Sequence, residues 1–136
     1  MTKTFTLCKD ERLYLREAIS ELFANGKGFM VFPYRIIYNV LPEDNPQVAR
    51  VAIMTIAPKK KFKHAVDRNR EKRLMREAYR LNKVPLIKAC ETEHKKLQVA
   101  FIFNNNQHIT FQEAEEHIKK AINIICKKLP LWRNEA

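Results

Sequence analysis

The chain has 136 residues, of which 46% are hydrophobic, and its formal net charge at pH 7 is +11. This length and composition predict a single domain over residues 1–136 with one hydrophobic core, and the charge predicts a polyanionic partner, because a positive field attracts phosphate groups. No apolar run reaches the roughly 18 residues that a membrane span needs, and the amino terminus has no apolar block of signal-peptide length, so we expect a cytoplasmic protein.

The first half of the chain predicts one helix followed by two strands. Residues Asp10 to Phe23 carry apolar side chains at helical spacing, and Asn25-Gly26 supplies a stop signal. The segment GFMVFPYRIIYNVL, from Gly28 to Leu41, is rich in aromatic and β-branched residues and predicts one strand, in which Pro33 indicates an edge or a bulge. After a turn, the apolar run from Ala49 to Ala57 predicts a strand buried on both faces.

The second half predicts a helix, a strand and a helix. The helix runs from about Ala65 to Asn82, a short helical or irregular piece follows it, and the strand runs from Leu97 to Phe103. Thr110 and Glu113 form a capping box at the start of the last helix. Its predicted buried face consists of Phe111, Ala114, Ile118, Ala121, Ile122, Ile125 and Leu129. The order of elements, helix-strand-strand-helix-strand-helix, predicts an α/β protein.

Most of the positive charge lies in one segment. From Lys59 to Lys83 the sequence has 11 basic and 3 acidic residues, so this segment carries +8 of the net +11. At about 100° per residue, six polar and basic side chains of the helix fall within an arc of about 140°. These are Arg68, Asn69, Lys72, Arg73, Arg76 and Arg80. Leu74, Ala78 and Leu81 lie opposite, which predicts an apolar back against the sheet and a cationic front.

The cationic front is either an ordinary solvated surface or a nucleic-acid-binding surface. We favour nucleic acid, because acidic partners at i±4 are nearly absent from the arc and neighbouring like charges repel until a polyanion neutralises them. Structured RNA fits better than DNA, since no helix-turn-helix pattern precedes the helix. Lys59, Lys60, Lys61 and Lys63 extend the positive zone upstream. Phe62, between these lysines, is expected to anchor the loop in the core, with base stacking as the alternative.

The remaining reactive residue types predict neither a metal site nor a catalytic group. Cys8, Cys90 and Cys126 fit no disulfide framework or zinc pattern and are expected to be reduced thiols. The four histidines, His64, His94, His108 and His117, form no i, i+4 ligand pair. Asp67, Glu71 and Glu77 lie among arginines, where helix capping or intrahelical pairing explains them.

The segment KHAVDRNREKRLMREAYR resembles the RNR motif of the bacterial ribonuclease P protein family, and PKK precedes it at the end of a strand. ERL followed by ELFANGKGF resembles the first helix and turn of that family, so the resemblance covers nearly the whole chain. It implies an α/β sandwich of the ribosomal protein S5 domain 2 type. In this fold a left-handed crossover links the second predicted strand to the third, whereas about 98% of such crossovers are right-handed.

The resemblance also implies a function. Members of the family are the small basic partners of a catalytic RNA that removes the 5′ leader from precursor tRNA. The resemblance then implies that catalysis and Mg²⁺ binding belong mainly to the RNA, that the protein is accessory and binds no metal alone, and that it is a monomer within the holoenzyme. The motif residues that would hold the RNA are Arg68, Asn69, Arg70, Lys72, Arg73 and Arg76. A structural RNA-binding or ribosome-associated protein and a self-sufficient nuclease are the alternatives.

A second surface is implied for the single-stranded leader, in a cleft between the first helix and the sheet. Matching from Gly26 without gaps assigns Ile19, Phe23, Arg35 and Ile37 to this cleft. Ile19 departs from the phenylalanine that the family has there, and a slip of one residue would replace Ile37 by Tyr38, because a one-residue slip exchanges the two faces of a strand. Phe23 has an alternative role as a core residue.

Overall fold

The computed structural model describes residues 11–13, 16–47 and 49–131, so the predictions for Asp10 and Cys8 fall outside the described residues. The elements are α1 (Arg16–Asn25), β1 (Lys27–Val31), β2 (Tyr34–Pro42), β3 (Val51–Ile56), α2 (Ala65–Asn82), α3 (Val84–Thr92), β4 (Lys95–Phe103), α4 (Phe111–Lys128) and a short 3₁₀ helix, η2 (Leu129–Leu131).

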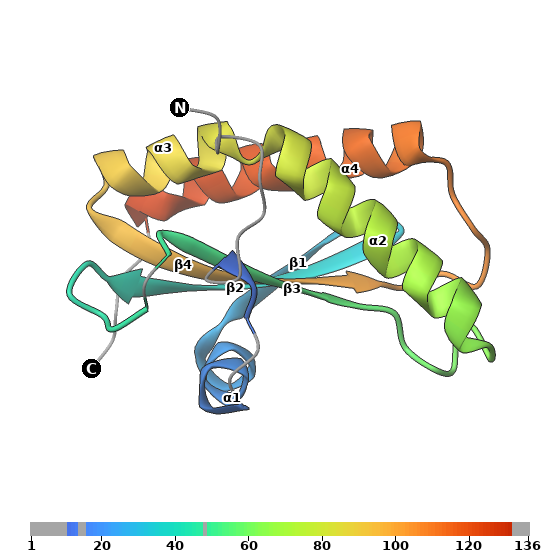
Figure 1. The fold of residues 1–136 in the computed structure, drawn as a ribbon. Helices are drawn as coiled ribbons and strands as arrows, with labels where there is room; N and C mark the ends of the chain where they lie inside the picture. The colour runs from blue at the N-terminus through green and yellow to red at the C-terminus, as the bar shows by residue number, and fades with distance from the viewer. Residues whose placement is uncertain (1–10, 14–15, 48, 132–136) are drawn as a thin grey trace.

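The strands form one sheet in the order β1-β2-β4-β3. β1 and β4 each pair with β2 in antiparallel fashion, whereas β3 pairs with β4 in parallel. The helices α2, α3 and α4 cover one face of the sheet, and α1 lies on the opposite face (Figure 1). The predicted mixed α/β fold is confirmed.

The connection from β3 to β4 has the rarer hand. β3 forms the edge of the sheet nearest the viewer in Figure 1, and the chain passes through α2 and α3 above the sheet before it returns to β4, farther from the viewer. This path is left-handed, as the resemblance implies. Chain sterics alone would favour the opposite hand, because about 98% of parallel crossovers are right-handed.

The prediction of one strand from Gly28 to Leu41 is wrong. The segment is a hairpin, in which β1 pairs with β2 from Lys27↔Tyr38 to Val31↔Tyr34, and the chain reverses at Phe32-Pro33. The β-forming composition continues through the reversal, so Pro33 was the only local sign of it. The carbonyl of Pro33 accepts a hydrogen bond from the backbone N–H of Asn104 at 2.7 Å, which fixes the turn against the end of β4.

The prediction that the strand after residue 49 is buried on both faces is also wrong. β3 is an edge strand, with Val51 to Ile53 buried and Met54 to Ile56 only half-buried. The N-terminal segment lies along this edge, where the backbone N–H of Leu13 donates to the carbonyl of Ile53 at 2.6 Å. β4, which lies between β2 and β3, is instead buried continuously from Leu97 to Phe101, and an apolar run alone does not distinguish the two positions.

The main core lies between the sheet and the three helices. The largest side chains in it include Tyr34, Ile36, Leu97, Phe101 and Phe103 from β2 and β4, all fully buried. The capping box of α4 is present as predicted, and its predicted buried face is confirmed except at Phe111, which is exposed. Phe111 is the first helical residue, so its side chain projects beyond the packed part of α4. A smaller cluster of Leu22, Ile37 and Ala100 forms under α1.

The buried stripe of α2 differs from the predicted apolar back. Glu71, Met75, Ala78 and Tyr79 are buried, whereas Leu81 is exposed. These four follow the i, i+4, i+7, i+8 spacing of a packed helix face, and the large side chains of Met75 and Tyr79 occupy the space that smaller residues would leave empty. In the described part of the chain, no helix has both the length and the apolar character needed to cross a membrane.

Candidate nucleic-acid interface

Outside its buried residues, α2 carries Arg68, Asn69, Lys72, Arg73 and Arg76, which we call the basic face. Asn69 and Arg73 are exposed, and the other three are half-buried along their aliphatic stems. Within the described residues, Lys72, Arg73 and Arg76 form no ion pair with a carboxylate. The structure therefore presents three cations on one rigid helix with their charges available to an anion.

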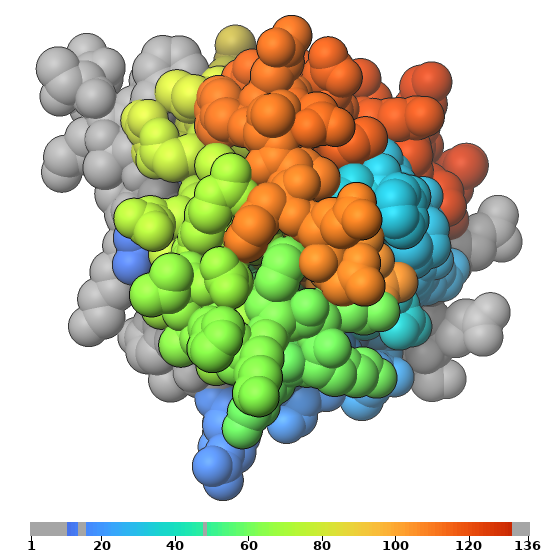
Figure 2. Space-filling model, turned by 90° about the vertical axis from the view of Figure 1, so that its right-hand side faces the viewer, coloured from blue at the N-terminus to red at the C-terminus, as the bar shows by residue number. Residues whose placement is uncertain are grey.

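The loop before α2 extends this positive area. We call residues 59–63 the lysine loop; Lys59, Lys60 and Lys63 are exposed and Lys61 is half-buried. Nη1 of Arg68 donates to the carbonyl oxygens of Phe62 at 2.9 Å and Lys63 at 3.0 Å, which holds the loop against the first turn of α2. Figure 2 shows the loop and these first turns as one continuous green surface.

Phe62 anchors the lysine loop in the core, as predicted. Its exposed fraction is 8%, and its ring stacks on Phe103 with 5.6 Å between centroids and on His108 with 4.6 Å. The side chain is therefore not displayed as a platform on which a base could stack.

Two of the arginines that are predicted to contact RNA have carboxylate partners within the protein. Arg70 pairs with Glu71, and its Nη2 donates to the carbonyl of Ile109 at 3.3 Å, so its side chain points toward the β4–α4 loop. Arg80 pairs with Glu77 at 2.9 Å, and this hydrogen bond lowers the pKa of the Glu77 carboxyl. Arg80 is thus a residue of the arc with an acidic partner three positions earlier on the helix.

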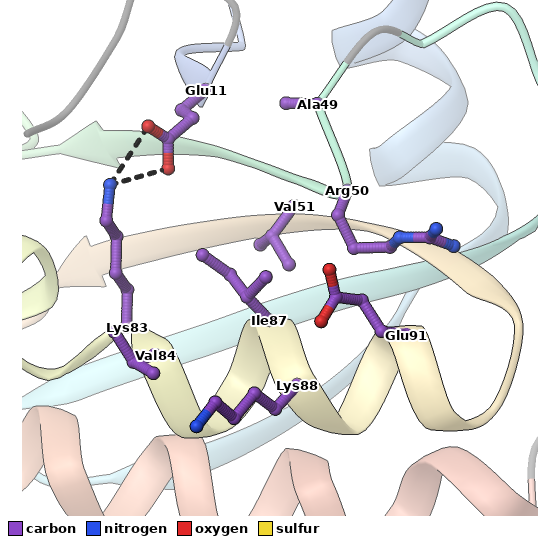
Figure 3. Close-up of a pocket in the computed structure, with 9 residues that line it drawn as sticks. All are labelled: Glu11, Ala49, Arg50, Val51, Lys83, Val84, Ile87, Lys88 and Glu91. Carbon is purple, nitrogen blue, oxygen red and sulfur yellow. Dashed lines mark hydrogen bonds and ion pairs between the residues drawn. The ribbon is translucent and has the colours of Figure 1, made fainter. Parts of the chain in front are cut away.

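Lys83, the last of the eleven basic residues in the segment, does not contribute to the surface. Its ammonium group is buried and lies 2.9 Å from the carboxylate of Glu11 (Figure 3). This ion pair stands at one end of a pocket of about 370 Å³, whose apolar lining includes Val51, Val84 and Ile87. The pair ties the N-terminal segment to the end of α2.

The structure adds one cation that helix periodicity could not predict. Arg12 lies in the N-terminal segment, where it forms a β-bridge with Ile53 at the outer edge of β3. Burial lowers the pKa of Arg76, and the nearby positive charges of Arg12 and Arg73 lower it further. Arg12 therefore lies close to the basic face, a position that only the tertiary fold reveals.

A second candidate surface lies on the α1 side of the sheet. Side chains of paired residues share a face, so Met30, Arg35 and Ile102 form a row across β1, β2 and β4, which we call the open row. α1 packs next to this row through Leu22, which contacts Ile37 and Ala100. Met30 is 49% exposed and Arg35 is also exposed, so the row joins apolar surface to a cation.

The four residues assigned to the leader cleft all lie on or beside this face. Ile37 faces α1, whereas Tyr38 belongs to the main core on the other face, so Ile37 is the one of the two that lies on the α1 side of the sheet. Ile19 is half-buried on α1, and Phe23 is 44% exposed, which excludes the alternative that Phe23 is a core residue. Met30 was missed because the hairpin was missed: once β1 is paired with β2, Met30 lies opposite Arg35.

The two cysteines that the structure describes have no features of reactive groups. Cys90 is buried and Cys126 half-buried, and both are free thiols. Burial raises the pKa of Cys90 to about 12 and also raises the pKa of Cys126, so neither forms a thiolate near neutral pH. Among the residues that the structure describes, no group of three or more histidine, cysteine, aspartate or glutamate side chains is arranged to hold a metal ion.

Comparisons with known proteins point to one family. A family model described as Ribonuclease P matches residues 7–126. The chain is 39% identical over 127 residues to the ribonuclease P protein component of Porphyromonas gingivalis W83, covering 93% of this chain and 91% of the relative. It is 30% identical over 128 residues to the corresponding protein of Chlorobium phaeobacteroides, covering 88% of each.

Solved structures share the fold. The Staphylococcus aureus RNase P protein superposes with a TM-score of 0.64 at 15% identity, covering 85% of this chain and 94% of the other. The RNase P protein from Thermotoga maritima superposes with a TM-score of 0.63 at 19% identity, covering 84% and 96%.

Proposed function

The chain belongs to the ribonuclease P protein family, and we propose that it works as the protein subunit of the ribonucleoprotein that removes the 5′ leader from precursor tRNA. In this role the protein binds the catalytic RNA through the basic face and the lysine loop, and the precursor tRNA through the open row. It acts as one copy within a cytoplasmic holoenzyme.

The observation that carries this proposal is the set of cations without carboxylate partners on α2. Lys72, Arg73 and Arg76 project from a helix whose opposite stripe is fixed in the core, so their spacing is set before any ligand arrives. Guanidinium groups bridge phosphate oxygens bidentately, and each neutralised phosphate releases condensed counterions. A folded RNA backbone offers phosphates at the density that such a surface needs.

The open row suits an unpaired strand rather than a helix of RNA. Single-stranded nucleic acid is held by stacking its bases on apolar or aromatic side chains while cations contact its phosphates. Phe23 and Met30 provide the exposed apolar area, and Arg35 provides the cation. Beside α1, the half-buried Ile19 and the buried Ile37 add apolar surface beneath them. We therefore assign the 5′ leader to this surface.

The catalytic groups and the Mg²⁺ ions belong, in this proposal, to the RNA. The acidic residues near the basic face already have partners within the protein: Asp67 contacts His108, Glu71 contacts Arg70, and Glu77 contacts Arg80. The protein contributes by reducing phosphate repulsion and by holding the leader, which raises the affinity of the complex for substrate and for metal.

Reconstitution tests the proposal. Cleavage of a precursor tRNA at low Mg²⁺ is measured with the protein alone, with a ribonuclease P RNA alone, and with both. Activity that requires both supports the proposed role. Binding of the RNA without any gain in cleavage would indicate a structural RNA-binding protein, and cleavage by the protein alone would indicate a self-sufficient nuclease.

A further inference from the structure

A fully buried carboxylate lies beneath the basic face. Glu71 is in α2, between Arg70 and Lys72, and its exposed fraction is 0%. Its Oε2 contacts Nη1 of Arg70 and Nδ1 of His108, which belongs to the β4–α4 loop. The other ring nitrogen of His108, Nε2, lies 3.2 Å from Oδ1 of Asp67, one turn earlier in α2. Intrahelical pairing, the sequence-based expectation for these acids, does not account for His108.

This geometry places a carboxylate oxygen at each ring nitrogen of His108. Both ring nitrogens face carboxylate oxygens, and a neutral imidazole has only one N–H to donate, whereas the imidazolium donates from both. The cluster consists of two carboxylates from α2, the Arg70 guanidinium and His108, so it is electrically balanced only when His108 is charged. Tyr34 on β2 and Glu113 on α4 lie near this cluster, because burial and the negative charges of Glu71 and Glu113, in that order, raise the pKa of Tyr34.

The cluster is connected to the RNA-binding surface through Phe62. The ring of His108 is stacked on that of Phe62, with an interplanar angle of 10°. The carbonyl oxygens of Phe62 and Lys63 in turn accept hydrogen bonds from Arg68 on the basic face. Figure 2 shows the β4–α4 loop, in orange, against the green surface of the lysine loop and α2. Displacement of His108 would therefore remove one of the contacts that hold the lysine loop in place.

We propose that Asp67, Glu71 and His108 form a proton-dependent lock, in which they act as positioning residues that hold the lysine loop and the first turn of α2 in the RNA-binding arrangement. This inference rests on the proposed function. A neutral His108 ring can donate to only one of the two carboxylates, so the other faces a ring-nitrogen lone pair and that contact is lost. The loop then samples other positions, and the affinity for RNA falls by the fraction of molecules that leave the locked arrangement.

The first test replaces His108 by asparagine in the full chain and measures its affinity for a transcribed bacterial ribonuclease P RNA. If His108→Asn leaves the locked arrangement populated about one-fifth of the time, the Kd rises about fivefold. The slope of log K against log salt stays as in the unsubstituted chain, because the bound state keeps all its phosphate contacts. His94→Asn is the matched control, since His94 is exposed in the α3–β4 turn and its substitution should leave the affinity unchanged.

The second test follows the affinity between about pH 6 and about pH 8, the range in which histidine changes charge. The affinity of the unsubstituted chain should fall more steeply than that of His108→Asn across this range. Asp67→Asn places at Nε2 an amide that can donate to the ring nitrogen, and it leaves the contact to Glu71, so a neutral ring then satisfies both contacts. This variant should keep its affinity at the upper pH, and it serves if His108→Asn fails to fold by circular dichroism.

The outcomes distinguish failure of the proposed lock from failure of the proposed function. If the unsubstituted chain fails to bind the RNA, the proposed function is wrong. If that chain binds and both variants match it in affinity and pH response, the lock alone is overturned. A salt slope that drops by about one in His108→Asn would show that His108 itself contacts a phosphate, which also contradicts a positioning role.

Discussion

The basic face and the open row are both exposed, but their side chains differ in chemistry. The basic face consists of cations on an 18-residue helix whose buried stripe lies in the main core. The open row is mostly apolar, carries one arginine, and lies beside a 10-residue helix that is seated on a small cluster of three buried residues. The first surface suits phosphates and the second suits bases. We therefore expect substitutions in the two regions to differ in salt dependence, in RNA target and in their effect on stability.

The largest expected effect is on the catalytic RNA, from removing two cations of the basic face. Arg73→Ala combined with Arg76→Ala should weaken RNA affinity by about 3 kcal/mol and reduce the salt slope by about two, because each arginine neutralises about one phosphate. Filter binding over a salt series measures both quantities. The matched control is Lys119→Ala combined with Lys120→Ala, which removes the same charge from exposed positions on α4. If both double variants lose the same RNA affinity, the loss reflects the net charge of the protein and not the position of the two arginines.

The next largest effect is on stability, and it concerns the packing of α1 against the sheet. Leu22→Ala should lower the free energy of unfolding by about 2–3 kcal/mol, since a buried leucine is replaced by a cavity in a small cluster. Chemical denaturation measures this change, with Leu81→Ala on exposed α2 surface as the control. Because the basic face does not depend on α1, catalytic RNA affinity should persist while precursor binding weakens. A parallel loss of both affinities would contradict the independence of the two regions.

A smaller effect is expected from the exposed aromatic residue beside the open row. Phe23→Ala should reduce the preference for leader-bearing over mature tRNA by about 1–2 kcal/mol, the range of one base–aromatic stacking contact. Its stability should change little, since the side chain is 44% exposed. Competition binding with the two tRNA forms measures the preference, and Phe111→Ala supplies an exposed phenylalanine on another surface as the control. Unchanged discrimination would remove Phe23 from the leader site.

The smallest effect concerns Arg12, which approaches the basic face from outside α2. Arg12→Ala should weaken catalytic RNA affinity by about 0.5–1 kcal/mol and reduce the salt slope by up to about one. The same filter-binding series detects this, with Lys119→Ala as a single-charge control. If Arg12→Ala lowers precursor affinity but leaves catalytic RNA affinity intact, Arg12 belongs with the open row instead.

The two regions also differ in how much of them the sequence predicts. The helix that carries the basic face is visible locally, because 18 residues of amphipathic pattern outweigh any competing signal, and its bounds, Ala65 to Asn82, are confirmed. The capping box at Thr110 is equally local. The open row depends on a hairpin, and the β-forming residues on both sides of Pro33 hide the reversal, so Met30 could not be placed opposite Arg35.

Long-range contacts account for the other differences. The partners of Arg70 and Glu71 include Ile109 and His108, which are brought to α2 only by the packing of α4. Composition alone would place the charge of Lys83 on the surface, yet Lys83 is buried and paired with Glu11. No periodicity encodes these pairings, because the residues involved are separated by tens of positions and belong to different elements.

Photocrosslinking tests the assignment of the two surfaces most directly. A photoreactive residue is placed at position 73 on the basic face or at position 23 beside the open row, and each labelled protein is bound to ribonuclease P RNA and precursor tRNA. The account predicts that position 73 labels the catalytic RNA and that position 23 labels the 5′ leader. Labelling of the leader from position 73, or of the catalytic RNA alone from position 23, would contradict it.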